Sequence, residues 1–171
     1  MKRFRHFGLA VVSLLLLASV APPVQAASNA FNAHLSGKDV VPARTTQATG
    51  QVKFTLSQDG TQLQYRINVS NIENVVSAQV FLGAAGENGA AVAMIYGPAA
   101  PGGGKTTGVL STGTITAASL IGSLAGQPVS ALVDAMKAGN AYVVVSTDDG
   151  QGAPDERPGD FTTGEIRGQI R

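Results

Sequence analysis

Alternating hydrophobic and polar residues mark most of the chain beyond residue 30, and Gly, Asn, Asp and Pro separate the runs. In residues 62–69 every second residue is apolar: Leu63, Tyr65, Ile67 and Val69. Side chains of a strand point alternately to its two faces, so this pattern predicts a half-buried β-strand. Residues 52–56 repeat the pattern, and the Gln-Asp-Gly of residues 58–60 predicts a hairpin turn between the two strands.

Six further segments have the length and composition of strands: residues 31–36, 75–82, 91–96, 108–116, 141–147 and 163–171. The run 91–96 is apolar throughout, which predicts a central strand. In the closing segment, Ile166 and Ile170 share one face. Glu165 and Arg167 then take the other face, where we expect exposure to solvent and a contribution to stability of about 0 to 1 kcal/mol.

Residues 128–139 break the two-residue period. Apolar residues recur there at helical spacing between a starting Pro and a final Gly: Val129, Leu132, Val133 and Met136. This pattern is typical of a short amphipathic helix, and residues 117–124 predict a further helical turn. Both segments lie between predicted strands, so the fold class is all-β, an antiparallel β-sandwich of about seven to nine strands with one or two short helices in its crossovers.

The first 26 residues have a different character. Residues 2–5 are mostly basic, residues 9–18 are almost entirely apolar, and a Pro- and Ala-rich exit ends at Ala26. This order predicts a secretory signal peptide over residues 1–26, with an uncleaved anchor as the alternative. The apolar run is short of the about 20 residues that span a bilayer, so we expect no transmembrane span in the mature chain. Residues 27–171 are then a single domain, secreted or periplasmic.

Charge and cysteine content narrow the function classes. The whole chain has 12 basic and 11 acidic residues, and because three of the basic ones lie in the predicted leader, the remainder has a formal charge of −2. This balance predicts no nucleic-acid partner, because it lacks the excess of Lys and Arg that neutralises phosphates. There is no cysteine, so we expect no disulfides and a fold that depends on its own core.

Several phrases, taken in order, resemble the chordin-type (CHRD) domain: residues 31–37, 41–42, 48–50, 78–83, 86–89, 141–145 and 164–170. The last, Gly-Glu-Ile-Arg-Gly-Gln-Ile, is the most specific. The resemblance covers essentially all of residues 27–171. It implies an extracytoplasmic, immunoglobulin-like or superoxide-dismutase-like sandwich of the kind found in secreted bacterial proteins, in a family for which no enzymatic activity is established as a whole.

Histidines distinguish this chain from its relatives. Family members often carry them where this chain has Gln79, Phe81 and Ser146, so a metal site inherited from such histidines is not expected here. His34 is the only histidine of residues 27–171, which excludes a copper and zinc dismutase. It alternates with apolar neighbours as an outward strand residue, and no Gly-x-Ser-x-Gly motif accompanies it, so we predict no catalytic residue and no resident cofactor.

The acidic segment 148–160 is the remaining candidate site. Five carboxylates there are hard oxygen ligands of the kind that Ca²⁺ accepts: Asp148, Asp149, Asp155, Glu156 and Asp160. The segment lacks the Asp-x-Asp-x-Asp-Gly order of a known calcium loop, and a solvated charged loop is the commoner explanation.

Three functions follow from these observations. The leading hypothesis is a noncatalytic secreted or periplasmic binding or structural module of the CHRD type, whose partner is an unknown extracytoplasmic protein or surface ligand. The alternative is a calcium-binding extracellular domain that uses residues 148–160. The third is a hydrolase with a carboxylate acid and base, although nothing in the sequence specifies the spacing that two such carboxylates require.

Overall fold

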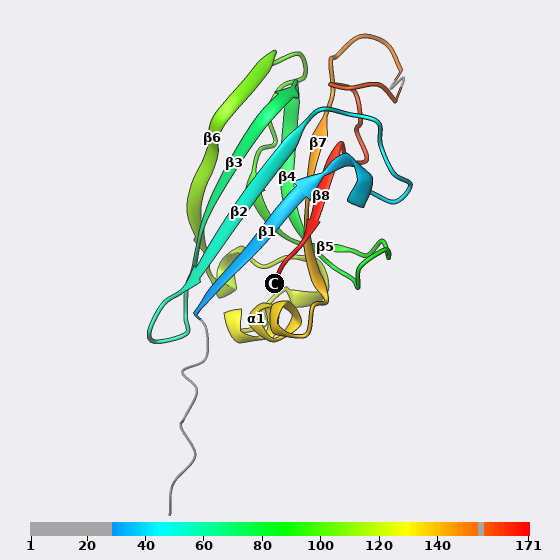
Figure 1. Ribbon diagram of the computed structural model, residues 1–171. Coiled ribbons are helices and arrows are strands. Elements are labelled where there is room, and N and C mark those ends of the chain that lie inside the picture. The colour runs from blue at the N-terminus through cyan, green and yellow to red at the C-terminus, as the bar shows by residue number, and fades with distance from the viewer. Residues whose placement is uncertain (1–28, 154–155) are drawn as a thin grey trace, which may run out of the picture.

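One antiparallel sheet of eight strands forms the body of the protein (Figure 1). The computed structural model describes residues 29–153 and 156–171. The predicted leader, residues 1–26, lies outside this range. The strands are β1 (Ala30–Ser36), β2 (Thr49–Leu56), β3 (Leu63–Glu73), β4 (Val75–Leu82), β5 (Ala91–Tyr96), β6 (Lys105–Ile115), β7 (Ala141–Thr147) and β8 (Ile166–Gln169). The all-β prediction is confirmed.

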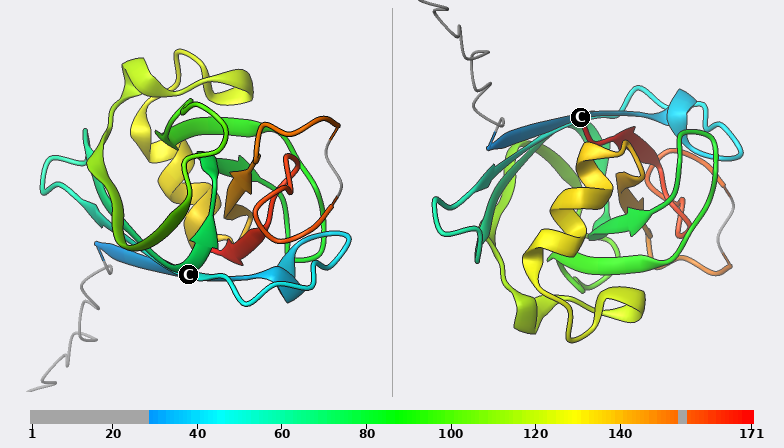
Figure 2. Two further views of the ribbon diagram at one scale, coloured as in Figure 1. Left: turned by 90° about the horizontal axis from the view of Figure 1, so that it is seen from above. Right: turned by 90° about the horizontal axis from the view of Figure 1, so that it is seen from below.

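The sheet has the order β5-β4-β7-β8-β1-β2-β3-β6, and it curls until its two ends come close together (Figure 2). Both layers of the predicted sandwich therefore belong to one continuous sheet. The short strand β8 joins them, because it pairs with β7 on one side and with β1 on the other. The β1 contact is brief: Ser36 pairs with Arg167, and a bridge joins Ala33 to Ile170.

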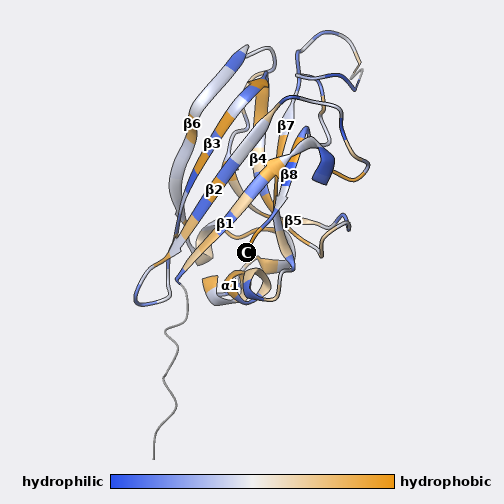
Figure 3. Cartoon of the chain, viewed as in Figure 1, coloured by the Kyte–Doolittle hydropathy of each residue, from blue (hydrophilic) through white to orange (hydrophobic). Residues whose placement is uncertain are grey.

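The period-two pattern determines which residues enter the core. Val52 and Phe54 of β2 face Ile67 and Tyr65 of β3 in register, and the apolar and polar bands alternate along both strands (Figure 3). The predicted hairpin turn joins these strands. Asp59 accepts hydrogen bonds there from the Ser57 hydroxyl (2.6 Å) and from the backbone N–H of Thr61 (3.1 Å), which hold the turn closed. These bonds lower the pKa of Asp59, with that from Ser57 the largest cause.

Strand β5 is not central as its apolar sequence predicted. It is the first strand of the sheet and pairs only with β4. Its other edge is covered by the segment that follows β6, where Leu120 forms a bridge with Ala93 and the N–H of Ile121 donates to the carbonyl of Val92 (2.9 Å). This cover explains why an edge strand is so apolar.

The predicted helices are present in the crossover between β6 and β7. Helix α1 (Val129–Lys137) begins after Pro128 and ends before Gly139, which has φ 71°. Two short 3₁₀ turns, η2 (Ala117–Ser119) and η3 (Gly122–Leu124), precede it, and a third, η1 (Gly37–Asp39), follows β1. Helix α1 lies across one end of the curled sheet (Figure 2) and buries four apolar residues against the core: Val129, Leu132, Val133 and Met136. Within the described residues, every helix falls short of the length and apolar character that crossing a membrane requires.

Candidate functional site

A groove of about 580 Å³, lined mostly by polar side chains, lies on the outer face of the sheet, where β8 meets β1 and β2. Alternation along β1 creates its floor: Phe31, Ala33 and Leu35 are buried, so Asn32 and His34 point outward. Residues 38–41, in and after η1, and residues 85 and 86 of the β4–β5 loop also line the groove. The remaining lining residues come from β2 and the C-terminal segment: Gln51, Arg167, Gln169 and Arg171.

Arg167 is buried, contrary to the prediction that it faces solvent. Only 2% of the residue is exposed. Its guanidinium lies 3.5 Å from the centre of the Tyr142 ring and donates to the carbonyl oxygens of Ala84 (3.1 Å) and Glu87 (2.7 Å) and to Oδ1 of Asn88 (3.1 Å). The loop between β4 and β5 wraps over the outer face of β8, which a strand pattern alone does not indicate.

These contacts fix the shape of the groove. Asn88, which accepts from Arg167, also donates to the carbonyl oxygen of Val41 (2.8 Å), so the two walls are linked to one another. Gln169 is held by two further carbonyls, of Gly83 (2.9 Å) and Gly139 (2.6 Å). Burial lowers the pKa of Arg167, and the nearby Tyr142 and Asp39 act in the opposite direction. An arginine in a protein nevertheless keeps its charge at neutral pH.

Glu165 is also buried, and the prediction of a solvent-facing residue was wrong here too. None of its surface is exposed. The carboxylate accepts hydrogen bonds from the hydroxyls of Thr46 (2.5 Å) and Thr147 (2.8 Å) and from the N–H of Gly159 (2.9 Å). It thereby ties the loop before β2 and the loop before β8 to the end of β7. Glu165 and Arg167 bind different partners. The ion pairs of the described residues do not include one between these two side chains.

His34 does not form a catalytic triad with its neighbours. Ser36 and Asp39 lie nearby in the chain, but the Ser36 hydroxyl donates directly to the Asp39 carboxylate (2.5 Å). In a triad the serine donates to histidine and the histidine to the acid. Across the described residues, no side-chain hydrogen bond joins His34 to either group. Asp39 is the only carboxylate among the lining residues, so the groove lacks the carboxylate pair of glycoside hydrolysis.

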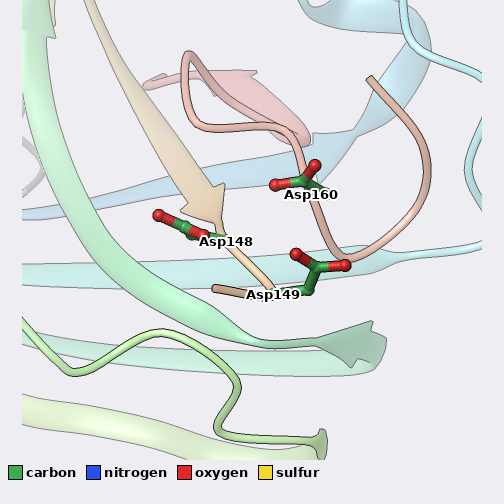
Figure 4. A group of neighbouring side chains, drawn as sticks. All are labelled: Asp148, Asp149 and Asp160. Atoms are coloured by element: carbon green, nitrogen blue, oxygen red, sulfur yellow. The ribbon is translucent and has the colours of Figure 1, made fainter. Parts of the chain in front are cut away.

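The acidic segment brings together three of its five predicted calcium ligands (Figure 4). One oxygen from each of Asp148, Asp149 and Asp160 lies within 4.8 Å of the others. Glu156 is instead in an ion pair with Arg44 (3.1 Å), and Asp155 lies outside the described residues.

Hydrogen bonds already occupy carboxylates of this cluster. Asp149 accepts from the Arg157 guanidinium (2.8 Å) and from the N–H of Gln151 (2.8 Å), and these two bonds, with Arg157 the larger cause, hold the pKa of Asp149 below its ordinary value. Asp148 accepts from the N–H of Gly150 (2.8 Å). A cation entering this cluster has to compete with the positive charge of Arg157.

Comparison with known proteins identifies the family of most of the chain. A family model described as the CHRD domain matches residues 31–153. The chain belongs to the CHRD family. No curated protein and no solved structure matches it. Membership in this family supports a noncatalytic module in general terms. The matched range ends before residues 164–170, the segment that contributes Arg167 and Glu165.

Proposed function

We propose that this CHRD-family chain is a noncatalytic binding module of an exported protein and that its ligand occupies the groove on the outer face of β8, β1 and β2. One observation carries the proposal: the groove is lined mostly by polar side chains, and its shape is fixed by part-buried hydrogen bonds from Arg167 and Gln169. Such pre-organisation reduces the entropy that binding costs. The predicted leader over residues 1–26 supports export.

The test is retention of ligand by the immobilised protein from native extracellular material, followed by hydrogen exchange to locate the contact. We expect His34→Ala/Gln51→Ala to lose the retained material, because both side chains line the groove. The matched control is Gln127→Ala/Ser130→Ala, which alters two exposed residues, one just before α1 and one in its first turn. Equal retention by both double variants, or protection away from β8 and β1, would contradict the proposed site. Turnover of ester, peptide or glycan substrates would contradict a noncatalytic role.

A calcium-binding domain is the second candidate, and the cluster of Asp148, Asp149 and Asp160 is the observation that favours it. A ligand that binds only the folded state stabilises it by about 2.7 kcal/mol at a concentration of 100 Kd, so calcium at such a concentration should raise Tm. Asp160→Asn should abolish the rise, and the control Glu73→Gln should retain it. A Tm that is unchanged by millimolar calcium and by chelator removes this candidate.

A further inference from the structure

Cations that are in no ion pair collect on one face of the protein, where Asp39 is the only acidic side chain among the residues that line the groove. Of the nine basic residues after residue 26, three are in ion pairs: Arg44, Lys105 and Arg157. Within the described chain the other six have no ion pair. Five of these six lie on the groove or on the outer face beside it: Lys38, Lys53, Arg66, Arg167 and Arg171. The sixth, Lys137, ends α1.

Two of these cations are placed where they weaken the sheet. Lys53 of β2 and Arg66 of β3 are direct partners in the register, and both are exposed on the outer face. Like charges directly opposite one another destabilise a pair of strands. Strands β8, β1 and β2 contain no acid, and the single acid of β3, Glu73, is in an ion pair with Lys105 at 3.3 Å. Within the described fold neither Lys53 nor Arg66 is in an ion pair, so an external anion is the simplest reason for placing two cations opposite one another.

The spacing of the charges indicates an extended ligand. Arg171 exchanges backbone hydrogen bonds with Asn32, Asn32 pairs with Lys53, and Lys53 pairs with Arg66. This row crosses four neighbouring chain segments, a width of about 14 Å at 4.8 Å per strand. A single carboxylate or phosphate needs donors that converge on one point, whereas this row suits anions repeated along a polymer.

A second row of side chains, next to the cations, offers hydrogen-bonding groups. His34 pairs with Gln51, and Gln51 with Asn68, so imidazole and amide groups lie side by side next to the cations. Such groups donate and accept hydrogen bonds, which is what sugar hydroxyls require. We propose that this outer face binds a linear acidic polysaccharide, whose carboxylates meet the row of cations and whose hydroxyls meet the row of amides. The inference rests on the binding function proposed above and names its ligand class.

Other polyanions fit this face less well. Single-stranded nucleic acids bind through stacking on exposed aromatic rings, but the aromatic residues of β1, β2 and β3 point toward the core: Phe31, Phe54 and Tyr65. A membrane surface favours apolar side chains that insert among the lipids. Of the exposed large apolar residues in the described chain, only Val41 borders the groove; the others are Met94, Val109 and Ile121.

The experiment measures binding of the purified protein to polygalacturonate, with the fully methyl-esterified polymer and dextran as uncharged probes. We expect binding to polygalacturonate alone, weakened as salt rises from about 0.05 M to about 0.5 M. Lys53→Gln/Arg66→Gln should weaken it about tenfold. The control Lys105→Gln/Lys137→Gln removes two positive charges at other places on the surface, and it should change the affinity for polygalacturonate by less than about twofold. All four residues are exposed, so each double variant should fold.

The outcomes separate the ligand class from the binding function. Equal binding to the esterified polymer, equal losses in both double variants, or tighter binding to anionic phosphatidylserine vesicles through Lys53 and Arg66 would overturn the acidic polysaccharide. If the protein then still retains another ligand that His34→Ala/Gln51→Ala loses, the binding module stands and only its ligand class falls. If neither His34→Ala/Gln51→Ala nor Lys53→Gln/Arg66→Gln changes the binding of any ligand, both proposals fall.

Discussion

At the scale of single residues, two of the buried charged side chains near the C-terminus, Glu165 and Arg167, determine how the loops are held. Glu165 accepts three hydrogen bonds from groups far apart in the sequence, namely the hydroxyls of Thr46 and Thr147 and the N–H of Gly159. Removing a buried acceptor leaves its donors unpaired, at about 1–3 kcal/mol for each unsatisfied group. A hollow of about 430 Å³ borders the site and admits water, which reduces that cost.

We therefore expect Glu165→Ala to lower the free energy of unfolding by about 2 kcal/mol, as measured by urea denaturation. The control is Gln64→Ala, which removes an exposed side chain from the outer face of β3 and should change stability by less than about 0.5 kcal/mol. Similar stabilities for the two variants would show that the network around Glu165 does not support the fold.

Arg167 depends on the shape of its guanidinium as well as on its charge. It stacks on Tyr142 and donates in three directions to the β4–β5 loop, which the single ammonium of lysine cannot reproduce. We expect Arg167→Lys to cost about 2 kcal/mol and to speed amide exchange in residues 84–90. The control Arg66→Lys makes the same change at an exposed position and should leave both the stability and the amide exchange of residues 84–90 unchanged. Unaltered exchange in the loop would mean that Arg167 does not hold it.

At the scale of elements, the closing strand β8 shows what a pattern determines and what it leaves open. Ile166 of β8 and Ile170, which directly follows the strand, are buried as predicted. The strand also contains Gly168, which faces β1 so closely that a Cβ at this position would overlap the carbonyl oxygen of His34. Because β1 is paired on both sides at this point, its backbone has little freedom to move away.

We expect Gly168→Ala to destabilise the protein by about 3 kcal/mol or more, seen as a large fall in Tm or as loss of soluble protein. Gly60→Ala is the comparison. Gly60 has φ 71° but no atom within 4 Å of an added Cβ, so only the backbone conformation is penalised, by about 1 kcal/mol. If the two variants are equally stable, the close approach of β8 to β1 is not a constraint on the fold.

The same elements show how far the sequence predicts the structure. The alternation in residues 52–69 and the turn residues between them were sufficient for the β2–β3 hairpin, because period and turn chemistry are both local. The burial of Arg167 was not predictable in this way. A period of two assigns Arg167 to the outer face, but whether a loop covers that face depends on contacts 80 residues away, at Glu87. For the same reason, the apolar residues of β5 did not indicate which segment covers its edge.

The candidate site was predicted only in part. Composition identified the acidic segment, and three of its carboxylates do cluster. The groove was missed, because its residues come from three strands and two loops and none forms a motif in sequence. One signal was available: Lys53 and Arg66 occupy outward positions of a hairpin whose register the turn determines, so their like-charge pairing was implied by the prediction of that hairpin.

At the scale of the whole molecule, the order of the strands separates the groove from the weakest part of the sheet. The groove lies on β8, β1 and β2, in the middle of the order, where each strand is paired on both sides. The ends of the order, β5 and β6, approach each other with no strand pairing between them in the described chain. Backbone amides that are paired on both sides open only with much of the structure, whereas those at an unpaired edge open locally.

Native-state hydrogen exchange should therefore give β7 and β8 the strongest protection, near the free energy of global unfolding, and leave alternate amides of β6 weakly protected. The bulge at Val109 and Leu110, where β6 loses register with β3, should exchange fastest within that strand. Uniform protection of β6 at the level of β7 would show that the two ends of the sheet are joined. The groove is far in the strand order from the unpaired edges of β5 and β6. A ligand on β8, β1 and β2 should therefore increase protection in those strands and leave the protection of β6 unchanged, so hydrogen exchange directly tests where binding occurs.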